Sequence, residues 1–193
     1  MEAFIWNRHF FTGIEIVDSQ HHRLVDITNE LGDVMLGGDE LSEGRMQILF
    51  KELADYAREH FHDEEELMRQ AGLDARHLDL HVKHHHQFVE QLTTMWRVRG
   101  AMKHPAETFH GFLSAWLAFH ILGEDQVMAR QIARVKAGES AQIAYELETQ
   151  SQDNSTVALL MALKTVFHLL AEQNHDLADA NQRLLKEIAT HRG

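Results

Sequence analysis

Apolar residues recur at helical spacing along four long segments, and this periodicity limits the fold more than any other feature of the sequence. Glycines separate the segments, and the only proline, Pro105, suits the first turn of the fourth helix because its ring presets the backbone angle. Ser42 is a candidate cap for the second helix. No alternating run with a hairpin turn interrupts the pattern. We therefore predict an all-α fold, an antiparallel four-helix bundle with short loops. The predicted helices cover about residues 20–36, 42–68, 77–98 and 105–135.

The sequence changes character after the fourth segment. Residues 137–155 are polar and predict a connector or a weak helix, whereas two series of residues in 156–193 repeat every seven positions, as in a coiled coil. A fifth helix folded back on the bundle is the alternative, but asparagines at core positions favour a register between two chains. We predict a bundle domain at 1–136 and a homodimer through the C-terminal helix. The predicted dimer seam consists of Leu160, Leu163, Phe167, Leu170, Asn174, Leu177, Asn181, Leu184 and Ile188.

Charge and cysteine content limit the partners and cofactors. The net charge is −12, from 18 basic and 30 acidic residues, so nucleic acid and anionic membranes are poor partners. No leader-like amino terminus and no apolar run of roughly 20 residues occurs, which predicts a soluble cytoplasmic protein without a membrane partner. The chain contains no cysteine, which excludes thiolate zinc sites, iron–sulfur clusters and covalently attached haem. Nitrogen and oxygen atoms must therefore hold any metal.

Histidines recur at four-residue spacing within the predicted helices. The chain contains 16 histidines, several times the usual share. His60 and Glu64 share one helix face, and His77, His81 and His85 share another. A single helical histidine usually lies at the surface, but here several donors fall among apolar neighbours in several helices. Burying so many polar groups without partners would be costly, so the pattern predicts a metal site in the bundle core.

The first and fourth segments add further donors. His21 and His22 are adjacent, about 100° apart around the helix, so only one of them can face the core. His120 and Asp125 are five residues apart, about 140° around an ideal helix. Both can face the core only if the helix widens locally, and we predict a π-helical turn near Gly123.

Four strings in this order resemble the bacterial hemerythrins: DSQHHRL (18–24), HFHDEEELM (60–68), HVKHHHQF (81–88) and HILGED (120–125). The resemblance covers about residues 6–130 and implies two iron ions, bridged by an oxo or hydroxo group and by carboxylates, with dioxygen as the ligand at an open position. In that family three histidines serve one iron and two serve the other. The implied metal ligands are His21, His60, Glu64, His81, His85, His120 and Asp125.

The same resemblance separates these ligands from the remaining histidines. His77 is then expected beside the ligands or at the surface. His62, His84 and His86 are expected to be exposed to solvent.

Seven nitrogen and oxygen donors shared by two ions favour iron, with manganese second, because structural zinc prefers four ligands and calcium prefers oxygen. Phe61, Trp116 and Ile121 are expected to line the dioxygen pocket and exclude water. No Ser-His-Asp order and no glycine-rich phosphate loop occurs, so we do not expect an enzyme.

The preferred functional hypothesis is an oxygen- or redox-sensing input module. The tail, about 36 residues or roughly 54 Å as a helix, is longer than ligand binding requires. Chains of this kind resemble signalling proteins in which such a domain feeds an output domain, so an output domain is an expected partner and the chain is then a fragment. The alternatives are a stand-alone carrier or store of oxygen, and a di-iron enzyme that reduces peroxide or nitric oxide.

Overall fold

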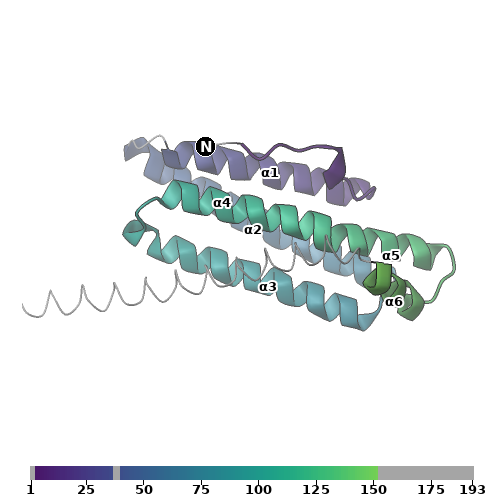
Figure 1. Cartoon of the computed structure of the whole chain (residues 1–193). Helices are drawn as coiled ribbons and strands as arrows, with labels where there is room; N and C mark the ends of the chain where they lie inside the picture. Colours follow the sequence, from purple (N-terminus) through teal and green to yellow (C-terminus); the bar gives the residue numbers. More distant parts are fainter. Residues whose placement is uncertain (1–2, 37–39, 152–193) are drawn as a thin grey trace, which may run out of the picture.

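Four long helices run antiparallel in the computed structural model, which describes residues 3–36 and 40–151 (Figure 1). These described residues contain helices, turns and loops but no strand, so the predicted all-α bundle is confirmed. The predicted C-terminal helix and its seam from Leu160 to Ile188 lie outside the described residues. Among the helices described, none is long and apolar enough to cross a membrane. The bundle helices are α1 (Glu15–Leu36), α2 (Glu40–Gln70), α3 (Ala75–Val98) and α4 (Pro105–His120).

Local sequence signals explain three of the helix ends. Gly72 has a positive φ of 66°, which a glycine adopts without strain, and it lies just after α2. The Asp74 side chain caps α3 by accepting a hydrogen bond from the backbone N–H of Arg76. Pro105 begins α4, as predicted. Ser42 was predicted to cap the second helix, but α2 already begins at Glu40, so Ser42 lies within its first turn.

The fourth rod of the bundle is the continuous helical segment 105–136, and its helix type changes along its length. After α4, residues Ile121–Asp125 form one π-helical turn, labelled η3. The chain then continues as α5, Gln126–Lys136, along the same direction (Figure 1). The predicted widening near Gly123 is therefore confirmed.

Two apolar clusters fill the bundle and leave a polar layer between them. The larger cluster includes Leu24, Phe61 and Ile121, and the smaller one consists of Val17, Met68, Met128 and Ile132 with their neighbours. On α1, α2 and the fourth rod, the candidate metal ligands fall in sequence between members of the two clusters. Apolar packing on both sides therefore encloses these polar side chains.

A further helix, α6 (Ala141–Ser151), occupies the segment predicted as a connector or weak helix, and it packs against α5. Its Glu148 is 2 % exposed and accepts hydrogen bonds from Arg130 Nε (2.7 Å) and Arg134 Nε (3.1 Å) of α5. The guanidinium of Arg76 on α3 lies 4.4 Å from the ring centre of Tyr145. Contacts to α3 and α5 thus hold α6 at this end of the bundle. The division into bundle domain, connector and coiled-coil helix stays a prediction.

Candidate metal centre

Seven buried side chains from four rods of the bundle meet in the polar layer, and they are the seven that the sequence analysis selected. None is more than 1 % exposed. They form two groups, and within each group one donor atom from every residue lies within 4.8 Å of the others. The first group is Glu64, His81, His85 and His120; the second is His21, His60, Glu64 and Asp125.

The two carboxylates lie between the groups. Glu64 Oε2 is 3.4 Å from His81 Nε2, while Glu64 Oε1 faces His21 Nε2 at 3.7 Å. Asp125 Oδ1 is 3.2 Å from His120 Nε2, and Asp125 Oδ2 is 3.1 Å from His21 Nε2. Each carboxylate therefore reaches histidines of both groups, as a bridging ligand must, and Glu64 Oε2 also lies 3.5 Å from His60 Nε2 of the second group.

Helix geometry accounts for how the donors reach one place. His60 and Glu64 are one turn apart on α2, and His81 and His85 are one turn apart on α3. His120 ends α4 and Asp125 ends the π-helical turn, and both are fully buried. A π-helical turn closes hydrogen bonds between residues five apart, so it brings this pair to one face as an α-helix does for residues four apart.

The buried donor atoms fit metal ions better than they fit one another. His21 Nε2, His60 Nε2, Glu64 Oε1 and both oxygens of Asp125 are fully buried and have no hydrogen-bond partner. His21 Nε2 and Asp125 Oδ2 are close enough to bond but are not oriented for it. Buried polar atoms are almost always satisfied, so donors that converge on common points without bonding indicate a cation at those points.

The ionisation of the cluster also suits a cation. Burial raises the pKa of Glu64, but His60 and the other surrounding histidines outweigh it and hold that pKa well below its usual range. Burial lowers the pKa of His60 well below its usual value, although the charge of Glu64 opposes this shift. For His21, burial lowers the pKa, but Asp125 and Glu64 outweigh it and raise it to about 9. The carboxylates thus attract a positive charge into the layer, which bound metal would supply.

A glutamine orients one of the histidines. His60 Nδ1 lies 3.0 Å from Gln20 Oε1, and the amide of Gln20 donates to Asp63 Oδ2 at 2.7 Å. Such a partner fixes the tautomer and leaves the other ring nitrogen free to bind metal. The sequence analysis missed this role, although Gln20 immediately precedes His21.

Two glutamates hold histidines of the first group. Glu65 Oε1 lies 3.1 Å from His85 Nδ1, and Glu124 Oε2 lies 2.8 Å from His120 Nδ1. A carboxylate partner makes an imidazole a stronger donor to metal. The sequence analysis did not select these glutamates either. The sequence did hold a signal for both glutamates, because each is adjacent to a carboxylate of the cluster.

The other histidines divide into buried and exposed. His77 is 8 % exposed, with its ring centre 5.9 Å from that of His81, so of the two predicted places it occupies the one beside the cluster. The expectation that His84 lies in solvent is wrong: its side chain is 14 % exposed and its Nδ1 pairs with Glu124 Oε1 at 2.5 Å, because the glutamate that holds His120 also faces α3. His62 and His86 are exposed, as expected.

Two of the three residues predicted to line a dioxygen pocket stack on histidines of the cluster. Phe61 stacks on the His85 ring at 3.9 Å between ring centres, and Trp116 stacks on His120 at 4.3 Å. Ile121 is fully buried. Phe61 and Trp116 thus place apolar surface beside the donors, while the role of all three residues as a ligand pocket stays a prediction.

A helical bundle with a buried histidine–carboxylate double cluster defines a class of non-haem metalloproteins. Comparison with known proteins gives the particular family: residues 12–132 match the family model described as the hemerythrin HHE cation binding domain, and the chain belongs to this family. This confirms the resemblance of the four sequence strings. Membership supports a non-haem iron protein that binds dioxygen.

Curated relatives agree with the family model. A bacteriohemerythrin of Pseudomonas aeruginosa is 33 % identical over 126 residues, which is 65 % of this chain and 78 % of the relative. One of Stenotrophomonas maltophilia is 30 % identical over 133 residues, or 68 % of this chain and 83 % of the relative. One of Clostridium acetobutylicum is 23 % identical over 126 residues, or 64 % and 96 % of the two chains. No solved structure matches the chain.

Proposed function

We propose that the chain binds dioxygen reversibly at a non-haem di-iron centre. The observation that carries the proposal is the position of Glu64 and Asp125, each of which reaches histidines of both groups. The proposed ligands are His81, His85 and His120 at one iron, His21 and His60 at the other, and Glu64 and Asp125 as bridges.

The shell around the proposed irons favours binding over catalysis. A pair of irons, when bound, supplies the two-electron redox capacity that reversible dioxygen binding requires. Two carboxylates neutralise less positive charge than four would, and this disfavours highly oxidised iron. Phe61, Trp116 and Ile121 exclude water from one side of the cluster. We therefore propose a binding protein and not an enzyme.

We further propose that the domain is the input module of a cytoplasmic signalling protein. The support is the heptad pattern of residues 156–193, which predicts a homodimer and a continuation toward an output domain. Helix α6 supports it as well, because Tyr145 and Glu148 attach this helix, which precedes the heptad region in the sequence, to α3 and α5.

The dioxygen proposal is tested on anaerobically reduced, iron-loaded protein by recording absorption during addition and removal of dioxygen. We expect a reversible change that disappears in His21→Ala and persists in the control His22→Ala, whose side chain is 55 % exposed. Equal loss or equal retention in the two variants would contradict the ligand assignment. Catalytic peroxide consumption would favour the enzyme alternative.

A measurement on residues 156–193 distinguishes an oxygen sensor from an oxygen store. Hydrogen exchange of residues 156–193 is measured in the reduced protein with and without dioxygen. A sensor predicts a change of at least roughly fivefold in exchange rate, the lower end of usual coupling between sites. A store predicts equal rates.

A further inference from the structure

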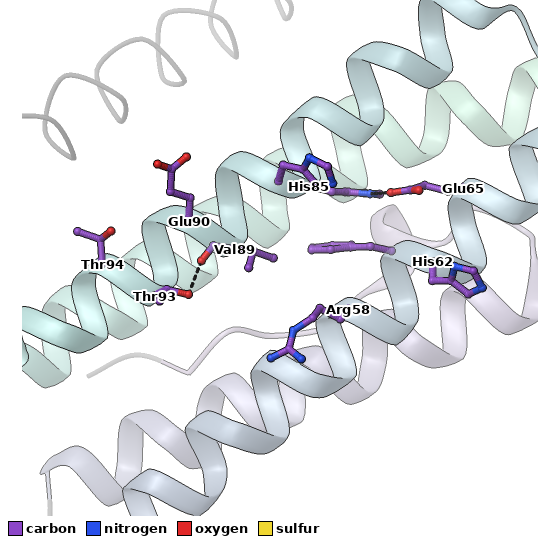
Figure 2. Close-up of a pocket in the computed structure, with 10 residues that line it drawn as sticks. Arg58, His62, Glu65, His85, Val89, Glu90, Thr93 and Thr94 are labelled. Atoms are coloured by element: carbon purple, nitrogen blue, oxygen red, sulfur yellow. Dashed lines mark hydrogen bonds and ion pairs between the residues drawn. The ribbon is translucent and has the colours of Figure 1, made fainter.

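A groove of about 510 Å³ runs over the surface between α2 and α3, directly beside the candidate metal centre (Figure 2). Phe61 and Val89 provide apolar surface to its lining, and Thr93 and Thr94 lie at its far end on α3. The ring of Phe61 also stacks on His85. One aromatic side chain therefore touches both the groove and a proposed iron ligand.

The part of the chain that follows α6 carries an apolar surface which the predicted dimer seam does not use. Leu159, Ala162, Val166 and Leu169 recur at steps of three and four, so on a helix they would form one stripe about 100° around from the seam. The stripe ends there, because polar Gln173 and Asp176 occupy the next two positions of the series. A two-chain seam alone would cover only the edge of this stripe, at Leu159 and Val166.

A helix that continued from α6 along α3 would reach the groove. Tyr145 of α6 packs under Arg76 near the start of α3. A helix rises 1.5 Å per residue, so Leu159 would come about 21 Å beyond Tyr145 along a continuing helix. The groove residues of α3, His85 to Thr94, begin about 14 Å and end about 27 Å beyond Arg76. Leu159 therefore comes level with the groove if the chain follows α3.

We propose that residues 157–171 of the same chain dock in the α2–α3 groove through the stripe Leu159, Ala162, Val166 and Leu169. The groove then joins the metal centre to the tail, with Phe61 in contact with both. The docking stands on the groove and the stripe; its link to dioxygen rests on the proposed function.

Cysteine cross-linking tests the docking, because the chain contains no cysteine of its own. Full-length protein carrying Glu90→Cys and Ala162→Cys is treated with a short bismaleimide, which reacts without oxidant. The matched control pairs Glu90→Cys with Lys164→Cys, which lies about 180° around the helix from the stripe. Mixed heavy- and light-isotope chains distinguish links within a chain from links between chains.

We expect the Ala162 pair to link within one chain at least roughly tenfold faster than the Lys164 pair, and Val89→Asp to slow that reaction. Equal rates in the two pairs would overturn the docking. Links only between chains would assign the groove to a second copy and would also overturn it.

The link to the metal centre is tested on the same iron-loaded sample, reduced and anaerobic, before and after addition of dioxygen. Coupling predicts a change of at least roughly fivefold in the cross-linking rate. Unchanged rates in protein whose absorption shows dioxygen binding would overturn the coupling. If the absorption does not respond to dioxygen, the proposed function is contradicted. The docking is then still decided by whether the Ala162 pair cross-links faster than the Lys164 pair.

Discussion

Removal of metal should destabilise the fold strongly, because the candidate centre lies inside it. Five buried atoms of four ligands lack hydrogen bonds: His21 Nε2, His60 Nε2, Glu64 Oε1 and both oxygens of Asp125. An unsatisfied buried polar atom costs about 1–3 kcal/mol. The five together amount to roughly 5–15 kcal/mol, which is comparable to the whole stability of a typical domain.

Even the lower limit, about 5 kcal/mol, predicts a measurable change in Tm. For a chain of this size, 1 kcal/mol shifts Tm by about 2–4 °C, so the metal-free protein should unfold at least roughly 10 °C below the iron-loaded protein. Circular dichroism during heating, with and without a chelator, measures the difference. In the control variant, which combines His60→Ala with Glu64→Ala, the chelator should leave Tm unchanged. A shift of less than about 3 °C in the unmodified protein would refute the reasoning.

Three further predictions test helix packing, the cap of α3 and the attachment of α6. Gly32→Ala should destabilise by about 1–3 kcal/mol in urea unfolding, because its Cβ would lie 2.8 Å from Cδ2 of His110. Gly111→Ala, with open space around the new methyl group, should stabilise by about 0.5–1 kcal/mol; the same sign for both would contradict the packing. Asp74→Ala should cost about 1 kcal/mol in thermal unfolding through loss of the α3 cap, and no change would contradict its role. Glu148→Gln should raise amide exchange in residues 141–151 at least roughly tenfold while iron content stays constant, and unchanged exchange would show that other contacts hold α6.

Periodicity was sufficient to predict the bundle, and spacing paired donors on single helices, but the choice of all seven ligands came from the resemblance to the bacterial hemerythrins. Donors four residues apart share a helix face whatever surrounds them, so His60 with Glu64 and His81 with His85 followed from the sequence alone. The π-helical turn was predictable as well, because five-residue spacing cannot place two side chains on one face of a regular helix.

The partners of the donors were not predictable in the same way. Gln20, Glu65 and Glu124 point along the helix surface toward histidines of other turns or helices, and which histidine each reaches depends on rotamers and on helix packing. His84 was misplaced for the same reason, since its partner Glu124 comes from another rod of the bundle. A sequence pattern shows which face a residue occupies, but not what faces it across the bundle.

Helix α6 was underestimated because its composition is polar. Its attachment depends on Glu148 between two arginines of α5 and on Tyr145 beneath Arg76, which are long-range pairs that a local pattern does not contain. The predicted seam beyond it, from Leu160 to Ile188, stays a prediction.

Iron content per chain, measured together with the near-ultraviolet spectrum of air-exposed protein, tests the central claim most directly. The reconstituted chain should hold two irons and show oxo-bridge absorption. His60→Ala combined with Glu64→Gln should lose both irons, whereas the exposed pair His62→Ala with Glu66→Gln, two residues further along α2, should keep both. One iron or none in the unmodified chain, or unchanged content after the first replacement, would contradict a di-iron centre at these seven side chains.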